Sequence, residues 1–187
     1  EAMSRFTFQI NLCNEFLRII DEAAVVANPI SADEIALMKC EARTLRALSY
    51  YHMMDLFGKG PWVTEEHSIG TTPETMTRAE MFPLVVADLE DAIKGLKPAS
   101  QTIYGRVSRE GALMLLAKLY LNAEVYTGTA MWQQCATACQ EIVKTIPDLA
   151  PTYRYLFCGS NDKYVASQSA GGPMEILWGI PQDNSNT

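Results

Sequence analysis

Acidic residues are the first candidates for chemistry in this sequence. Glu65 and Glu66 are adjacent, and Asp88, Glu90 and Asp91 follow one another closely further along the chain. Glycoside hydrolysis needs two carboxyl groups that face each other across a cleft, about 5 to 10 Å apart. Neighbouring residues on a helix do not face each other, so we interpret both groups as solvated acidic surface. The sequence therefore predicts no catalytic residues, and we expect the chain not to be an enzyme.

The histidines and cysteines do not have the spacing of a metal or redox site. His52 and His67 are the two histidines, and we expect His52 at the surface or edge of a helix and His67 in a loop. Cys135 and Cys139 lie four residues apart on a predicted helix. A metal or redox pair is one interpretation, but no further ligand lies at a suitable spacing. We favour two small apolar side chains on one helix face, and we expect no metal and no cofactor.

Aromatic residues are the groups in this chain best suited to binding a sugar. A flat ring stacks on the C–H face of a pyranose, and tryptophan adds a polar edge. Trp62 lies in a predicted loop together with His67, and we predict that these two residues bind carbohydrate. The alternative is that Trp62 packs beneath the helices, and Trp132 and Trp178 are expected to lie in the core.

Arg43 and Arg46 lie three residues apart on a predicted helix, close to Glu41. We interpret them as partners in ion pairs within or between helices, with their aliphatic stems packed on apolar neighbours.

Composition and charge limit the classes of protein to consider. The chain has 187 residues, 48% of them apolar and 20% charged, which is typical of one globular domain or a large piece of one. Its net charge of −7 repels phosphate backbones, so nucleic acid is not an expected partner. The longest apolar run, Ala112 to Ala117, is far shorter than the ~20 residues that span a bilayer. We therefore expect the chain itself to be soluble. No signal peptide is recognisable, so a targeting segment, if the protein has one, was removed or lies upstream.

Apolar periodicity predicts a mostly helical protein. Ser31 with Glu34, and Thr77 with Glu80, are spaced as capping boxes, and Gly58 is expected to end the second helix. Pro83 inside the third helix predicts a kink or a later start. The expected helices cover about residues 3 to 27, 31 to 57, 77 to 96, 108 to 126 and 130 to 146.

An internal repeat relates these helices. At an offset of 70 residues, the second helix matches the fourth, and at an offset of 50 the third matches the fifth; chance similarity is the alternative. The pattern predicts tetratricopeptide-like helical hairpins, an α–α superhelix in which each hairpin packs on the next. The matched pairs include Ala42 with Ala112, Tyr50 with Tyr120, Gly58 with Gly128, and Lys94 with Lys144.

The pattern changes after residue 150. We divide the chain into a helical repeat region, 1–150, and a loop-rich segment, 151–187. The second segment holds an aromatic cluster, and residues Glu175 to Ile180 are predicted to form a short strand, which needs a partner that is not evident. The cluster comprises Tyr153, Tyr155, Leu156 and Phe157.

Several motifs, in this order, resemble those of the SusD/RagB family of glycan-binding lipoproteins on the outer surface of Bacteroidetes. Trp62 departs from the family pattern, in which a smaller aliphatic residue is expected. The usual family member is also far longer than this chain. The motifs are Ile10 to Leu17, the Arg43/Arg46/Tyr50 helix with Gly58 and Pro61, Asp88 to Ile93, Gly105 to Ser108 with Ala117 to Leu121, Trp132 with Ala136, and Leu156-Phe157 with Glu175 to Trp178.

The resemblance implies a function in nutrient uptake and polysaccharide utilization. A SusD-like protein is expected on the extracellular face of the outer membrane, held by a lipid anchor that this chain lacks. There it captures oligosaccharide and partners a TonB-dependent SusC-type transporter. The alternative is a generic tetratricopeptide-like scaffold for protein–protein interaction that binds no sugar.

Overall fold

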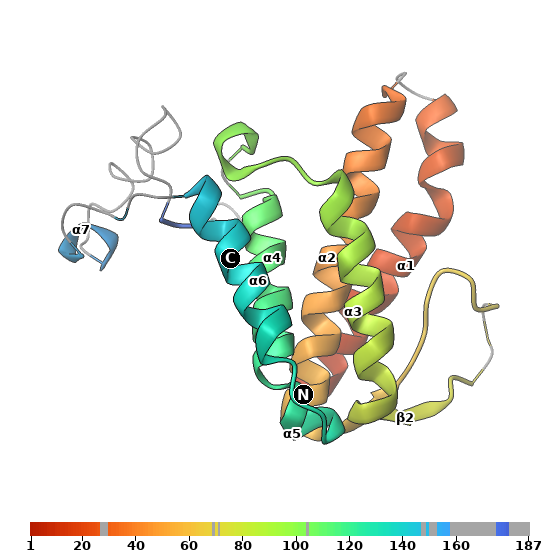
Figure 1. Cartoon of the computed structure of the whole chain (residues 1–187). Coiled ribbons are helices and arrows are strands. Elements are labelled where there is room, and N and C mark those ends of the chain that lie inside the picture. Colours follow the sequence, from red (N-terminus) through yellow and green to blue (C-terminus); the bar gives the residue numbers. More distant parts are fainter. Residues whose placement is uncertain are drawn as a thin grey trace.

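The structure is a computed structural model that describes residues 1–26, 30–68, 70, 72–103, 105–146, 149, 153–157 and 175–179, without the side chains of 23–26 and 154–155. Three long helices lie side by side, and a second helical pair lies against them (Figure 1). The three are α1 (Ala2–Val26), α2 (Ala32–Phe57) and α3 (Arg78–Gly95), and the pair is α4 (Arg109–Leu121) with α6 (Trp132–Thr145). The mostly helical fold predicted from the sequence is confirmed.

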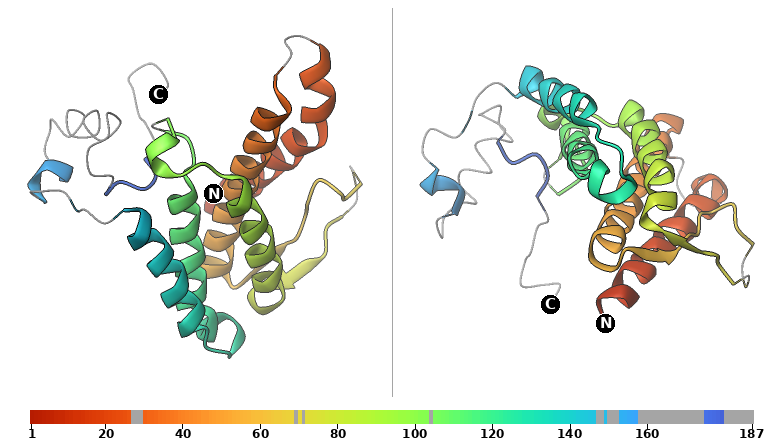
Figure 2. Two further views of the ribbon diagram at one scale, coloured as in Figure 1. Left: turned by 45° about the horizontal axis from the view of Figure 1, so that its top comes forward. Right: turned by 60° about the horizontal axis from the view of Figure 1, so that its bottom comes forward.

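The core lies where α2, α3 and α4 meet. Met53, Met54, Met81, Leu89 and Leu119 are completely buried there. The α1–α2 pair and the α4–α6 pair spread apart toward the end of the molecule away from α5 (Ala123–Thr127), as two further views show (Figure 2). The helices therefore pack tightly at one end and diverge at the other.

The predicted apolar stripe of the first helix is its buried face. Ile10, Cys13, Leu17 and Ile20 are buried, and α1 packs on α2. The opposite face leaves Phe8 and Leu12 exposed, and these two side chains become part of the candidate site.

The predicted caps are present, with one difference. Ser31 Oγ accepts a hydrogen bond from the Glu34 backbone N–H at 3.2 Å, but the Glu34 carboxylate accepts from Arg106 at 2.8 Å instead of closing the box. The Thr77–Glu80 box is complete. The α3 helix begins at Arg78, ahead of Pro83, so a later start is wrong; the capping box holds the first turn, and Pro83 faces solvent.

The two hairpins, α2–α3 and α4–α6, share details at the predicted offsets. Gly58 and Gly128 both end helices in the left-handed conformation, with φ of 70° and 80°. Each backbone N–H bonds to the carbonyl four residues earlier, at 3.0 and 2.9 Å. At the offset of 50, the ion pairs of Lys94 with Asp91 (2.6 Å) and of Lys144 with Glu141 (2.8 Å) match each other. These equivalences support the repeat.

The predicted helix from 108 to 126 is broken into two. Asn122 separates α4 from α5, with φ −96° and ψ 5°, and its N–H contacts the carbonyls of Lys118 and Tyr120. The regular hydrogen-bonding pattern of α4 is interrupted at this residue, and the short helix α5 then follows and ends at Gly128. Apolar periodicity alone did not reveal this break.

A small sheet was not predicted. Strand β1 (Lys59–Pro61) pairs antiparallel with β2 (Thr75–Thr77), with Gly60 opposite Met76. A Cβ at Gly60 would lie 2.1 Å from Met53 Sδ, so glycine lets the strand pass close to the core. The sheet joins the two ends of the loop that carries Trp62 and His67.

The predicted strand from Glu175 to Ile180 is wrong for the residues that the structure describes. Residues 175–179 have no strand, because no second strand pairs with them within the described ranges. The segment instead packs on the start of α4, where Ser108 Oγ donates to the Leu177 carbonyl. Ile180 and the boundary at 150/151 lie outside the described residues, so the division into 1–150 and 151–187 stays a prediction.

Two short helical elements complete the fold. A 3₁₀ turn, η1 (Ala99–Gln101), precedes α4, and α7 (Arg154–Phe157) contains part of the predicted aromatic cluster, in which Tyr153 and Phe157 have ring centroids 4.8 Å apart. Among the helices described, none combines the length and the apolar character needed to cross a bilayer.

Candidate functional site

A groove between α1 and the loop that links β1 to β2 is the candidate functional site. Its volume is about 720 Å³, and both predicted site residues, Trp62 and His67, line it. The α1 side contributes Phe8 and Leu12, which are 65% and 55% exposed. Its walls thus combine apolar and polar side chains; the polar and charged ones include Asn11, Asn14, Glu15, Arg18 and Glu74.

Trp62 is half-buried, packed on the helices on one side and open to the groove on the other. Its ring packs against that of Tyr50, with centroids 4.5 Å apart and planes at 34°. The same side chain also lines the groove. Its backbone N–H donates to the Glu74 carbonyl at 3.1 Å, so the two arms of the loop are joined beside the ring. Trp62 is therefore a rigidly supported aromatic wall.

His67 lies in the loop, as expected, and its ring orientation is defined by Thr64. The Thr64 backbone N–H donates to His67 Nδ1 at 3.1 Å. A neutral imidazole that accepts at Nδ1 carries its proton on Nε2. Within the described part of the chain Nε2 has no partner, so it can donate a hydrogen bond to a ligand.

The floor of the loop is fixed to the helices by Val63. The Tyr50 hydroxyl accepts from the Val63 N–H and donates to its carbonyl, both at 2.8 Å. The same carbonyl accepts from Asn14 Nδ2 at 3.0 Å. Burial raises the pKa of Tyr50 to about 12, so the hydroxyl stays protonated at neutral pH and keeps both bonds.

A buried ion cluster centred on Arg46 holds the same loop from below. Arg46 is 2% exposed; it binds Asp88 with two bonds of 2.9 Å, Asn14 Oδ1 at 2.7 Å, and the Glu65 carboxylate. Burial alone would lower the Arg46 pKa, but the two carboxylates outweigh burial and raise it. The interpretation of the arginines as ion-pair partners is confirmed, and Arg43 lies within 4 Å of Glu65 and Asp88 as well.

The interpretation of Glu65 and Asp88 as solvated acidic surface is therefore wrong. Burial raises the pKa of Asp88. Burial would also raise the pKa of Glu65, but hydrogen bonding together with the charges of Arg46 and Arg43 outweighs burial and lowers it. The two carboxylates meet because α3 and the loop pack on the same side of α2, a contact that sequence spacing does not reveal. The cluster is structural, since each carboxylate is bound to Arg46.

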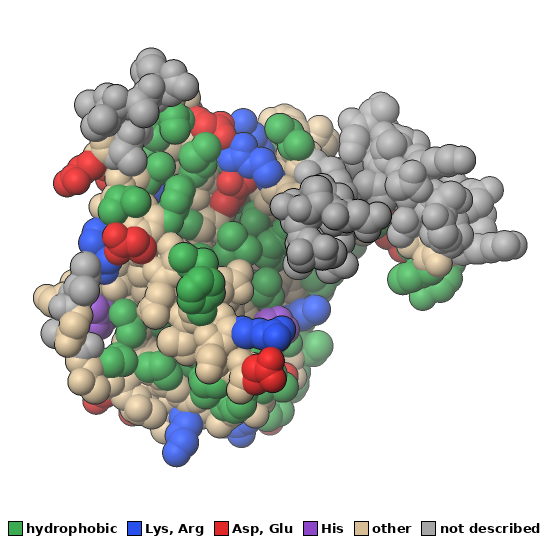
Figure 3. All heavy atoms as spheres, turned by 180° about the vertical axis from the view of Figure 1, so that it is seen from behind, with side chains coloured by type: hydrophobic (Ala, Val, Ile, Leu, Met, Phe, Trp, Pro, Cys, Tyr) green, Lys and Arg blue, Asp and Glu red, His purple; other side chains and the backbone are tan. Residues whose placement is uncertain are grey.

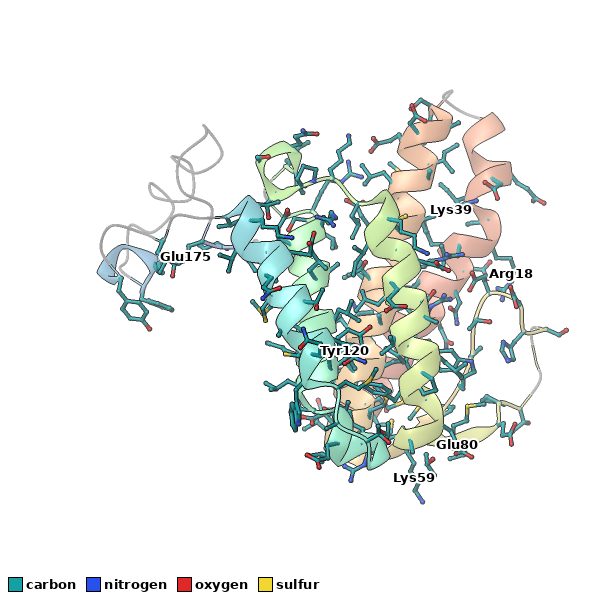
Figure 4. All side chains as sticks on the ribbon, in the orientation of Figure 1. Arg18, Lys39, Lys59, Glu80, Tyr120 and Glu175 are labelled. Carbon is teal, nitrogen blue, oxygen red and sulfur yellow. The ribbon has the colours of Figure 1, made fainter. Side chains whose placement is uncertain are left out.

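Arg18 closes the connection between the loop and α1. Its guanidinium donates to the carbonyls of Glu65 (3.3 Å) and His67 (3.5 Å) and pairs with the Glu15 carboxylate. Figure 4 shows Arg18 extending from α1 beside the loop. The first arm of the loop is thus bound to the helices at Val63, Glu65 and His67.

Other predicted residues lie away from this groove. Trp132 is 52% exposed, so its placement in the core is wrong; it is the first residue of α6, where its ring extends into solvent. Trp178 is half-buried against the core. His52 is half-buried and stacks on Phe6. Cys135 and Cys139 are half-buried free thiols, and no cluster of three metal-ligating side chains occurs among the described residues.

Sequence reasoning missed the contribution of the first helix to the site. Phe8 and Asn11 lie on the solvent side of the helix, opposite the predicted stripe. Exposed aromatic residues on that face were the available signal. Over the face of the molecule that α1 occupies, hydrophobic, acidic and basic side chains are interspersed (Figure 3).

The helical hairpins and the aromatic, polar-walled groove define a class of helical-repeat protein, and comparison with known proteins narrows this class. No family model matches the sequence. The chain is 29% identical over 154 residues to the starch-binding protein SusD of Bacteroides thetaiotaomicron, covering 82% of this chain and 27% of SusD. It is 25% identical over 183 residues to the SusD-like protein P25 of Formosa agariphila, covering 89% of this chain and 31% of P25.

A solved structure agrees with these relatives. A SusD-like protein from Bacteroides fragilis superimposes with a TM-score of 0.77 at 18% identity, over 97% of this chain and 33% of that protein. The chain is similar in sequence to SusD and to a SusD-like protein and shares the fold of a SusD-like structure, and it spans less than a third of the length of the two curated relatives.

Proposed function

We propose that the groove beside Trp62 binds oligosaccharide and that the protein is a SusD-like, glycan-capturing surface lipoprotein without enzymatic activity. The observation that carries the proposal is Trp62 itself, a half-buried ring that is packed on Tyr50 and also lines the groove. A supported aromatic ring offers a sugar a stacking surface at little conformational cost. The similarity of the chain to a starch-binding protein also supports an oligosaccharide as the ligand.

Polar groups around the ring suit the hydroxyls of a sugar. The Nε2 proton of His67 and the amide of Asn11 lie on the same groove. Neither group has a hydrogen-bond partner within the described part of the chain. Such groups give orientation and specificity to a ligand whose apolar face contacts the aromatic wall.

The proposal extends to the cellular setting that the family implies. The protein would sit on the extracellular face of the outer membrane through a lipid anchor, and it would deliver glycan to a TonB-dependent SusC-type transporter. The outer surfaces of the α2–α3 and α4–α6 hairpins are then available as the transporter interface. Co-purification of the protein with such a transporter from native outer membranes would test this part.

Binding of glycans by variants of the protein tests the proposed site. Trp62→Ala should reduce affinity in calorimetry or on a glycan array by about tenfold, because ring stacking contributes about 0.5–1.5 kcal/mol beyond the buried area and about 1.4 kcal/mol is tenfold in affinity. Trp62→Phe should retain part of the affinity. Trp132→Ala is the matched control, since that tryptophan is exposed and lies outside the groove. Unchanged binding by a folded Trp62→Ala variant would refute the site.

A further inference from the structure

The charges around the groove decide which oligosaccharides it can accept. Its lining contains two carboxylates, Glu15 and Glu74, and one guanidinium, Arg18. With histidine counted as neutral, the lining has a net charge of −1. A groove of this kind does not attract an anionic ligand.

Among the described residues of the lining, the one arginine, Arg18, already has partners. Arg18 pairs with Glu15 and donates to two backbone carbonyls of the loop. Arg46, beneath the loop, is buried and bound by Asp88 and Glu65. A carboxylate or sulfate on a sugar would therefore find no uncompensated guanidinium among the groups that line the groove.

Glu74 is in the opposite situation. Its backbone carbonyl accepts from the Trp62 N–H, which places the residue beside the aromatic wall. Within the described part of the chain its carboxylate makes no ion pair. An ionised carboxylate accepts hydrogen bonds at two oxygens, so it can accept from neighbouring hydroxyls of a sugar, and these charge-assisted bonds are stronger than neutral ones.

From these contacts we propose that the groove selects neutral, hydroxyl-rich oligosaccharides and discriminates against uronates and sulfated sugars, with Glu74 as the discriminating residue. This inference rests on the proposed glycan-binding function. Glu74 acts in two ways: it accepts from hydroxyls of the favoured ligand, and it repels a negative group on the disfavoured one. Specificity built on such a repulsive element is a general device.

Matched pairs of glycans test the inference directly. The probes are neutral hexasaccharides of glucose, mannose and galactose, each paired with the same oligomer whose C6 hydroxymethyl groups are oxidised to carboxylates. For every neutral oligomer that binds, calorimetry at low salt should give a dissociation constant about tenfold or more below that of its oxidised partner. The ratio of the affinities for the neutral and the oxidised oligomer should become smaller in 1 M NaCl, because the screening length falls to about 3 Å.

Two variants assign the discrimination to one side chain. Glu74→Gln should reduce the ratio of the affinities for neutral and oxidised oligomers about threefold or more. The substitution removes the repulsion between residue 74 and the sugar carboxylate and keeps the shape of the side chain. Glu66→Gln makes the same change of charge on an exposed residue of the same loop that does not line the groove, and it should leave the ratio unchanged.

The outcomes separate the two proposals. Oxidised oligomers that bind as well as neutral ones would overturn the inference and leave glycan binding intact. A ratio unaffected by Glu74→Gln would overturn the role of Glu74. Binding of no glycan of either kind, or binding that survives Trp62→Ala, would overturn the proposed function itself.

Discussion

The guanidinium of Arg46 lies 2.9 Å from each of the two carboxylate oxygens of Asp88, in a bidentate pair that joins α2 to α3 inside the protein. The same guanidinium binds Glu65 of the loop and Asn14 of α1. One buried side chain therefore connects three helices with the loop that carries the candidate site. Planar, bidentate recognition of this kind is specific to arginine.

Removing Asp88 should destabilise the protein strongly. Asp88→Ala removes the bidentate partner of the buried Arg46 and leaves Glu65 to balance both Arg43 and Arg46, and breaking a buried pair costs about 3–5 kcal/mol. Urea unfolding followed by circular dichroism measures the change. Asp91→Ala, on the same helix, removes a solvent-exposed pair with Lys94 and should alter stability little. Equal effects of the two variants would contradict a structural role for the cluster.

Alkaline pH should weaken the attachment of the loop to α2. The folded pKa of Tyr50 is raised from 10 to about 12 by burial, so its contribution is fully present below pH 10 and is lost as the pH rises through 12. Unfolding free energies measured between pH 9 and 12 should fall, and Tyr50→Phe should remove part of the slope. A slope identical in the variant would show that other groups are responsible.

The two helix-ending glycines should be equally intolerant of alanine. Gly58 and Gly128 have positive φ and open space where a Cβ would be, so backbone strain is the expected penalty, about 1 kcal/mol each. Denaturant midpoints of Gly58→Ala and Gly128→Ala provide the test. A large cost at one and none at the other would argue against equivalent positions in a repeat.

Gly60 should be intolerant of alanine for a different reason. A Cβ there would overlap Met53 Sδ at 2.1 Å, and overpacking of a core costs about 1–3 kcal/mol. Combining Gly60→Ala with Met53→Ala should recover part of that loss in a double-mutant cycle. Additive effects of the two changes would show that the residues are not coupled.

Local features of the helices were predictable from the sequence. The cap of α2 at Ser31, the Thr77–Glu80 box and the left-handed Gly58 depend on residues within about four positions of each other, and each occurs as predicted. The predictions failed where parts of the chain that are distant in sequence come together. The segment from Glu175 packs on α4 instead of forming a strand, and Trp132, at the start of α6, is exposed.

The amino-acid sequence by itself determined most of the helices and their caps and indicated the hairpin repeat, because these follow from periodicity and from side chains that reach a few residues along the chain. The tertiary structure alone decided that Asn14, Glu65 and Asp88 surround Arg46, and that Phe8 and Asn11 face Trp62 and His67 across one groove. Those contacts join residues as many as about sixty positions apart in the chain. Such contacts depend on how the helices pack and on the desolvation of charges between them, and no local pattern encodes either.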